Sequence, residues 1–203
     1  MMNRKSSVPV FLVLGALVVS SASAYVLLSP RRSWPSAVAI TVDNRGNSTI
    51  TDSDGGATAV ANAINANVSW NGAGSGTRVN ASKGSVASYA LGDGKVMLNF
   101  RDPIHACNGS CLAATFTGYY TGSTITDADI VTNPKNKLST LAEPDGCSAE
   151  YYAEGIMVHE VGHVLGLGHT TVTGATMYPS VSACNNGPAS IEADDKAAIN
   201  DLY

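Results

Sequence analysis

The sequence predicts an α+β domain, because segments typical of β-strands come mostly before the last two helical segments of the 203-residue chain. The composition supports a packed domain: 44% of the residues are hydrophobic and 14% are charged, and the 20 glycines indicate loops rather than disorder. The chain has no heptad pattern and no internal repeat, which excludes a coiled coil or a solenoid. Its formal net charge of −4 argues against nucleic acid as the main partner.

The N-terminus has the pattern of a secretory signal peptide. Arg4 and Lys5 precede an apolar run over residues 8–19, and small residues then follow up to Ala24. Cleavage after Ala24 would release the mature protein as a secreted, extracellular protein. We expect it to be a monomer. The expected division is a signal peptide over 1–24, a short N-terminal segment over 25–33 and one domain over 34–203.

An uncleaved membrane anchor is the alternative for this region. Apolar character resumes at residues 25–28, so the stretch 8–28 is long enough to cross a bilayer. Ser20, Ser21 and Ser23 weaken the middle of the stretch, which favours cleavage. In both cases the domain is exported, and a membrane is a partner only if the segment stays attached.

In the first half of the domain, the sequence predicts three strands and one helix. Residues 37–42 alternate between apolar and polar as a half-buried strand does. Residues 57–68 have a helical apolar stripe. Two further strands are expected over 86–91 and 95–100, joined in a hairpin through the turn at 92–94.

The second half predicts two more strands and two helices. The strands are expected over 112–116 and 124–131. Ser148 is a candidate cap for a helix that continues to about Leu165. Ser190 is a candidate cap for the last helix, which has acidic residues near its positive end.

The four cysteines fit an oxidising compartment, where an even number is typical of disulfides. Of the three pairings, Cys107–Cys111 and Cys147–Cys184 are favoured because the first pair brackets a short turn. A Cys147–Cys184 bridge would close a long loop and stabilise the fold by about 4 kcal/mol in the chain-entropy model. Free buried thiols are the alternative.

One helical segment, residues 156–165, contains the candidate chemistry. Apart from His159, Glu160 and His163, it is apolar or glycine, which predicts a buried helix. Burying a carboxylate and two imidazoles costs several kcal/mol unless they are satisfied. A divalent cation would satisfy them.

The spacing of these residues indicates how a cation is bound. His159 and His163 are four residues apart, so they lie on one face of the helix. Glu160 points to the side, where it can act on a water molecule. Gly166 can end the helix, and His169 can then turn back as a third ligand. Three imidazoles with an open position are typical of a catalytic rather than a structural zinc.

Three segments of the chain carry a resemblance to a known family. Residues 159–169 resemble the metzincin zinc motif. Residues 175–179, with Met177, resemble the Met-turn of the matrixins, and 191–203 are similar to the matrixin C-terminal helix. The resemblance implies a twisted, mostly parallel five-stranded sheet with one antiparallel edge strand and three helices, with the zinc in a cleft.

The resemblance also implies a function, that of a secreted zinc endopeptidase that hydrolyses protein or peptide substrates. His159, His163 and His169 would hold one zinc ion, Met177 would lie beneath it, and Glu160 would be the general base. The residues expected at the substrate cleft are Leu112, Ala113, Ala114, Tyr178 and Pro179. A non-catalytic, zinc-stabilised peptide-binding module and a hydrolase of non-peptide amides are the alternatives.

The sequence departs from the matrixin pattern at a second, structural zinc. His105 is the one histidine outside the motif, and Ala114 and Asp129 stand where the resemblance would place two ligands. No such site is expected. No cysteine precedes Trp34, so a cysteine switch is not expected, and neither is an accessory domain after Tyr203.

Two acidic residues have two possible interpretations, one of which is a calcium site. Asp127 and Asp129 are candidates for a structural Ca²⁺ site, and solvated carboxylates at a strand end are the equal alternative.

Overall fold

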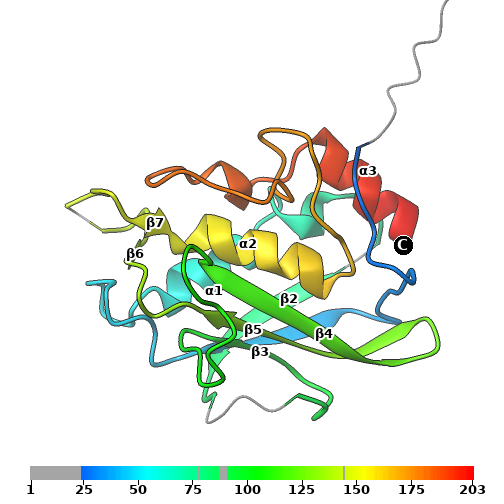
Figure 1. Ribbon diagram of the computed structural model, residues 1–203, viewed down its shortest axis with the longest axis horizontal. Coiled ribbons are helices and arrows are strands. Elements are labelled where there is room, and N and C mark those ends of the chain that lie inside the picture. Colours follow the sequence, from blue (N-terminus) through cyan, green and yellow to red (C-terminus); the bar gives the residue numbers. More distant parts are fainter. Residues whose placement is uncertain (1–23, 77, 87–90, 144) are drawn as a thin grey trace, which may run out of the picture.

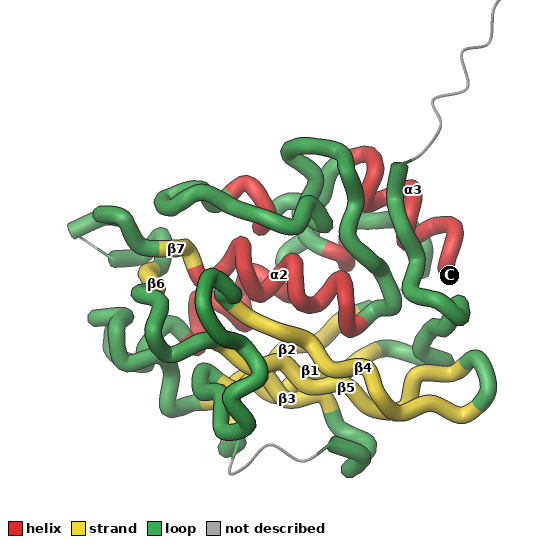
Figure 2. The backbone as a smooth tube through the Cα atoms, in the orientation of Figure 1, coloured by secondary structure: helices red, strands yellow, loops and turns green. Residues whose placement is uncertain are grey.

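A five-stranded sheet forms one layer of the molecule, and helices cover one side of it (Figures 1 and 2). The computed structural model describes residues 24–76, 78–86, 91–143 and 145–203. The strands are β1 (Val38–Asp43), β2 (Val79–Gly84), β3 (Val96–Asn99), β4 (Ala113–Thr121) and β5 (Thr124–Thr132). Their order is β2-β1-β3-β5-β4; all neighbours are parallel except β4, which is an antiparallel edge strand. This confirms the predicted sheet.

Three α-helices complete the fold, as predicted. They are α1 (Ala57–Asn65), α2 (Ala153–Val164) and α3 (Ala193–Leu202), with short 3₁₀ turns η1 (Trp70–Gly72) and η2 (Gly187–Ala189). A small parallel pair, β6 (Leu138–Ser139) and β7 (Tyr151–Tyr152), precedes α2. The core lies between the sheet and the helices α1 and α2.

The strand β5, next to the edge strand β4, has two different environments because its side chains alternate between the faces of the sheet. Ala128 and Ile130 are fully buried in the core shared with the helices. Asp127 and Asp129 are also buried, but they lie on the opposite face. The cross-strand partners follow the same alternation: Thr115 of β4 pairs with Ile130.

The predicted hairpin over residues 86–91 and 95–100 is wrong. The strand β3 pairs with β1 on one side and with β5 on the other, both in parallel, so neither side is left for an antiparallel partner. Residues 87–90 lie outside the described residues. The sequence analysis also missed β2, whose polar residues alternate with the buried Val79 and Ala81 at the edge of the sheet.

Three helix boundaries differ from the predicted ones. The helix α2 begins after Tyr152 rather than near Ser148, because Ala149 has a left-handed φ of 61° and residues 151–152 form β7. The helix α3 begins after Glu192, whose capping box with Asp195 replaces the predicted cap at Ser190. The helix α1 ends at residue 65 rather than 68.

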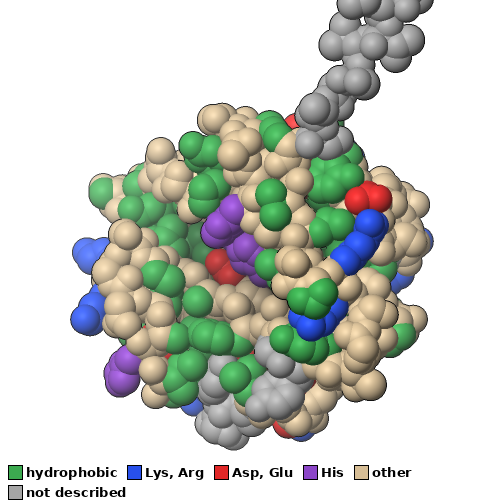
Figure 3. Space-filling view, turned by 45° about the vertical axis from the view of Figure 1, so that its right-hand side comes forward, with side chains coloured by type: hydrophobic (Ala, Val, Ile, Leu, Met, Phe, Trp, Pro, Cys, Tyr) green, Lys and Arg blue, Asp and Glu red, His purple; other side chains and the backbone are tan. Residues whose placement is uncertain are grey.

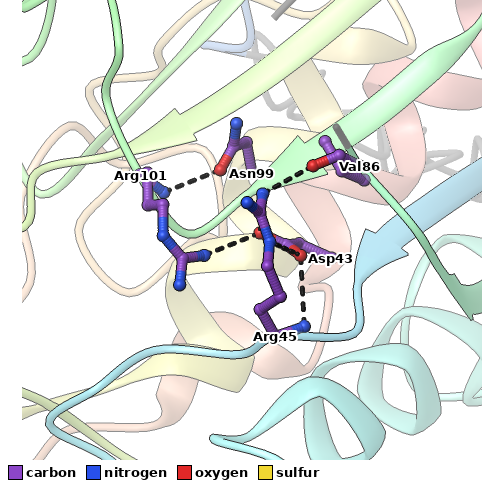
Figure 4. A network of polar contacts seen from close by, with 5 residues as sticks. All are labelled: Asp43, Arg45, Val86, Asn99 and Arg101. Carbon is purple, nitrogen blue, oxygen red and sulfur yellow. Dashed lines mark hydrogen bonds and ion pairs between the residues drawn. The ribbon is translucent and has the colours of Figure 1, made fainter. Parts of the chain in front are cut away.

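A fully buried carboxylate closes the carboxyl end of β1 (Figure 4). Asp43 accepts hydrogen bonds from the guanidinium of Arg45 and from Arg101 Nη1, at distances of 2.8 to 2.9 Å. Arg45 also donates to the carbonyl of Val86, and the Arg101 amide donates to Asn99 Oδ1. The charge of Asp43 is therefore paired with two guanidinium groups. The network also links the three segments that follow β1, β2 and β3.

The short N-terminal segment packs on the body of the domain. Leu27 forms a β-bridge with Leu167, and the Gly168 amide donates to the carbonyl of Val26 at 2.7 Å. Residues 1–23, which hold most of the predicted signal peptide and of the alternative anchor over 8–28, lie outside the described residues, whereas residues 24–28 are described. Within the described ranges, no helix has the length and apolar character needed to cross a membrane.

Candidate metal centre and active site

The helix α2 presents the candidate ligands from a largely buried helix. Ten of its twelve residues are buried, and its apolar side chains pack in the central core. His159 and His163 lie on one face, and the chain then turns at Gly166, where φ is 102°. Only glycine adopts this conformation readily, and a side chain there would also overlap the carbonyl of Arg32. The turn returns the chain so that His169 faces the two helical histidines.

The three imidazoles converge on one point, as the spacing predicted. The Nε2 atom of His169 lies 3.3 Å from that of His159 and 3.1 Å from that of His163. A tetrahedral zinc with Zn–N bonds of about 2.0–2.1 Å requires about 3.3 Å between ligand nitrogens. Among the described residues, these three histidines form the one group of three or more His, Cys, Asp or Glu side chains whose ligand atoms lie close enough to share a metal ion. The ligand set therefore fits zinc.

The tautomers also suit a metal. His159 Nδ1 lies 2.6 Å from the carbonyl oxygen of Thr176, and His163 Nδ1 lies 2.8 Å from that of Leu167. Since a carbonyl only accepts, each Nδ1 carries the proton and each Nε2 presents a lone pair. Burial, together with the neighbouring histidines, lowers the pKa of His159 to about 4, and burial lowers the pKa of His163 and His169. All three rings are therefore neutral at pH 7.

Glu160 lies beside the histidines and is 6% exposed. Burial raises its pKa to about 7, while a hydrogen bond from Thr115 acts in the opposite direction. In Figure 3, histidine side chains gather beside an acidic side chain in a hollow of the surface. A carboxylate with a pKa in this range is suited to exchange protons near neutral pH.

Met177 and Trp70 pack against α2 at Gly162. Gly162 lies between the two helical ligands, and a side chain at this position would overlap both Met177 and the Trp70 ring. The turn at Met177 is held by Asp195, whose carboxylate accepts from the amides of Thr176 and Met177 at 2.8 and 3.0 Å. Met177 therefore packs against α2 between the two helical histidines, and its expected place beneath a zinc ion stays a prediction.

A cavity of about 450 Å³ opens in front of Glu160, His159 and His169. Leu112 and Ala113 line one side of it, and Tyr178 and Pro179 line the other. The expected cleft residue Ala114 does not line the cavity, because its partner Val131 lies on the sheet face opposite to the helices. The further lining residues are Ser110, Cys111, Tyr151, Gly155, Ile156, Ser180, Val181 and Pro188.

The structure contains both predicted disulfides. Cys107–Cys111 closes the turn before β4, where Cys111 lines the cavity, and Cys147–Cys184 joins the segment before α2 to the segment beyond Pro179. Their Cα atoms are 5.3 and 5.5 Å apart, which suits a disulfide. The first bridge therefore lies at the edge of the cavity.

Several contributors to the site were missed by the sequence analysis. Thr115 was not identified, although it lies two residues beyond Ala113 and so on the same face of the strand. Tyr151 was assigned to a helix, and it instead lines the cavity from β7. Asp195 was interpreted as a helix-end charge, and no sequence signal shows that it reaches Met177. His105 is exposed in the loop before β4 and lies outside the histidine cluster.

Comparison with known proteins agrees with this geometry. The family model for matrixins matches residues 32–203. Metalloendoproteinase 4-MMP of Arabidopsis thaliana is 42% identical over 50 residues, which are 25% of this chain and 14% of that protein. Matrilysin of Rattus norvegicus is 36% identical over 63 residues, 27% of this chain and 24% of that protein. The matched stretches thus span less than a quarter of these relatives. Since the family model covers most of the chain, the chain belongs to the matrixin family.

Proposed function

We propose that the protein is an exported zinc endopeptidase that hydrolyses peptide bonds in protein or peptide substrates. The observation that carries this proposal is the convergence of three neutral imidazole Nε2 atoms beside a buried carboxylate, in front of an open cavity. The names of the matched relatives, which are metalloendoproteinases, support the same reaction.

The chain's own residues have separate roles in the proposed reaction. A zinc ion on His159, His163 and His169 would lower the pKa of a bound water to about 7 and polarise the substrate carbonyl. Glu160 accepts a proton from the attacking water and then delivers it to the nitrogen of the leaving amine. The carbonyls of Thr176 and Leu167 keep two of the imidazoles oriented.

The proposed substrate is an extended chain alongside β4. Among the described residues, β4 pairs with β5 alone and is an edge strand of the sheet next to the cavity. An extended peptide can add to such an edge through main-chain hydrogen bonds. Side-chain selection would then depend on the cavity wall between Tyr178 and Pro188.

Cleavage of a peptide library by the purified protein tests the proposed function. We expect cleavage that a zinc chelator removes and that added zinc restores. Cleavage that continues in the chelator would refute the metal-dependent mechanism. Binding of peptides without any cleavage would favour the zinc-stabilised binding module instead.

Export through a cleaved signal peptide is part of the proposal, and the two disulfides support it. The mature protein is expected to begin at Tyr25, which N-terminal sequencing of the exported protein would show. Recovery of the protein with residues 8–28 intact in a membrane fraction would favour the anchor.

We also propose a structural Ca²⁺ at Asp127 and Asp129. Each carboxylate has one buried oxygen without a hydrogen-bond partner, Asp127 Oδ1 and Asp129 Oδ2. Burial raises the pKa of Asp129 to about 6, and the charges of Asp127 and Asp93 add to this effect. A hard cation that prefers carboxylate oxygens would relieve this repulsion.

A further inference from the structure

The hydroxyl group of Thr115 contacts Glu160 across the gap between β4 and α2. Thr115 Oγ1 lies 2.5 Å from Glu160 Oε2 and 3.1 Å from the main-chain oxygen of the same residue. We infer that Thr115 is a positioning residue that holds the Glu160 carboxylate for the reaction. This inference rests on the proposed function of Glu160 as the base.

The strand β4 directs Thr115 toward α2. Its cross-strand partner, Ile130, is fully buried in the core between the sheet and the helices. Ala113, two residues earlier on the same face, lines the cavity. The strand that borders the cavity therefore also carries the hydroxyl that reaches the proposed base.

Within the described parts of the chain, the Thr115 hydroxyl is the one hydrogen-bond donor recorded for the Glu160 carboxylate. A glutamate side chain has several rotatable bonds, so a buried carboxylate keeps one orientation only if a partner holds it. One hydrogen bond to Oε2 fixes the direction of the carboxylate and still leaves it lone pairs that can accept the proton of the attacking water. The hydroxyl has a single proton, and the shorter contact, to Oε2, marks the carboxylate as its main acceptor, with the Glu160 carbonyl at 3.1 Å as the weaker one.

A purely structural role is the competing interpretation, in which the Thr115 hydroxyl only satisfies polar groups between β4 and α2. The two roles differ in what the conservative variant restores. Thr115→Ser keeps the hydroxyl, whereas Thr115→Val keeps the shape and removes it. Thr117→Val is the matched control, because Thr117 lies on the same strand, two residues from Thr115, and no hydrogen bond joins it to Glu160.

The test measures kcat and KM on a cleaved peptide, zinc content and melting temperature for these three variants. We expect Thr115→Val to lower kcat by about 10-fold, the effect of losing one hydrogen bond to a charged group, with KM within about twofold of wild type. Thr115→Ser should recover most of the loss, and Thr117→Val should match wild type. Zinc content should be the same in all.

A second measurement does not depend on activity. The loss of melting temperature caused by Thr115→Val should be smaller when Glu160 is already alanine, because the partner is then absent. Equal losses in both backgrounds would overturn the inference. So would wild-type kcat in Thr115→Val, or equal loss of kcat in Thr115→Val and Thr115→Ser. If Thr115→Val does not fold, Thr115→Ala takes its place in the comparison with Thr115→Ser.

Failure of the inference can be told apart from failure of the proposed function. If Glu160→Gln is inactive and Thr115→Val is fully active, only the role of Thr115 is wrong. If Glu160→Gln keeps full activity, the proposed base is wrong and the inference falls with it.

Discussion

A carboxylate is buried on each face of the sheet, but the two differ in their hydrogen-bond partners. On the helix side, Glu160 is 6% exposed and receives a hydrogen bond from Thr115. On the other side, Asp129 is 1% exposed and has one oxygen without a partner. Burial raises the pKa of both, to about 7 and about 6. Burial alone therefore does not identify a catalytic acid or base.

The difference lies in what surrounds each carboxylate. Glu160 lies beside three neutral imidazoles and lines an open cavity, where it can exchange a proton with water. Asp129 faces the like charges of Asp127 and Asp93, and it does not line the cavity in front of Glu160. The first environment suits proton transfer and the second suits a bound cation. Neutralising each carboxylate should therefore have different consequences.

The largest expected effect is on the helix side. Glu160→Gln removes the base while keeping the shape and a hydrogen-bond acceptor for Thr115. We expect kcat for peptide cleavage to fall by roughly 10³-fold, within the usual range for general base catalysis, with zinc content unchanged. Asp129→Asn, measured in parallel with calcium present, should change kcat far less. Equal losses in the two variants would mean that the faces do not differ in function.

The next effect concerns calcium on the other face. A ligand present at 100 times its Kd stabilises the folded state by about 2.7 kcal/mol. Added calcium should therefore raise the melting temperature of wild type and of Glu160→Gln equally. Asp127→Asn and Asp129→Asn should lose this response, because each removes a charged oxygen ligand. A full calcium response in both Asp variants would contradict the proposed site.

The pH dependence of stability follows from the raised pKa of Asp129. The folded state holds this proton up to about pH 6, whereas the unfolded chain releases it near pH 4. Without calcium, the stability that the protonated carboxyl contributes is present below pH 4 and is lost as the pH rises to 6. Asp129→Asn should remove this loss and stabilise the calcium-free protein by about 2 kcal/mol at pH 8, after allowance for solvent screening.

Urea unfolding of the calcium-free protein at pH 4 and pH 8 measures this difference. Wild type and Asp129→Asn should be close in stability at pH 4 and separate at pH 8. A wild type that gains stability relative to the variant on going to pH 8 would show that the carboxylate is favoured in the fold, contrary to the raised pKa.

The histidine site could be predicted from the sequence because its ligands lie close together along the chain. The ligands His159 and His163 share one helical face, and Gly166 permits the turn that brings back His169. The resemblance to matrixins supplied the number of strands and their mostly parallel arrangement, which no local pattern determines, whereas the order of the strands was not predicted. The two disulfide pairings were also predicted correctly.

Features that depend on distant contacts could not be predicted in this way. The hydroxyl of Thr115 meets Glu160 only because β4 lies against α2, 45 residues further along the chain. The hairpin expected after residue 86 was wrong because the parallel neighbours of β3 come from strands far away in sequence. The predicted cap at Ser148 failed because Ala149 adopts a left-handed turn. In the first two cases a long-range contact determined the structure, and in the third a local backbone conformation ended the predicted helix early.

The smallest expected effect compares two adjacent alanines on the two faces of β4. Ala113 lines the cavity, while Ala114 points to the side of Asp129. Ala113→Val should raise KM by about 10-fold, because added methyl groups occupy space that a substrate needs, a cost of about 1.4 kcal/mol. Ala114→Val should leave KM within about twofold, since the strand tolerates a β-branched residue. An equal rise of KM in Ala114→Val and Ala113→Val would mean that the substrate contacts both faces of the strand. That result would contradict the binding of an extended peptide along the edge of β4.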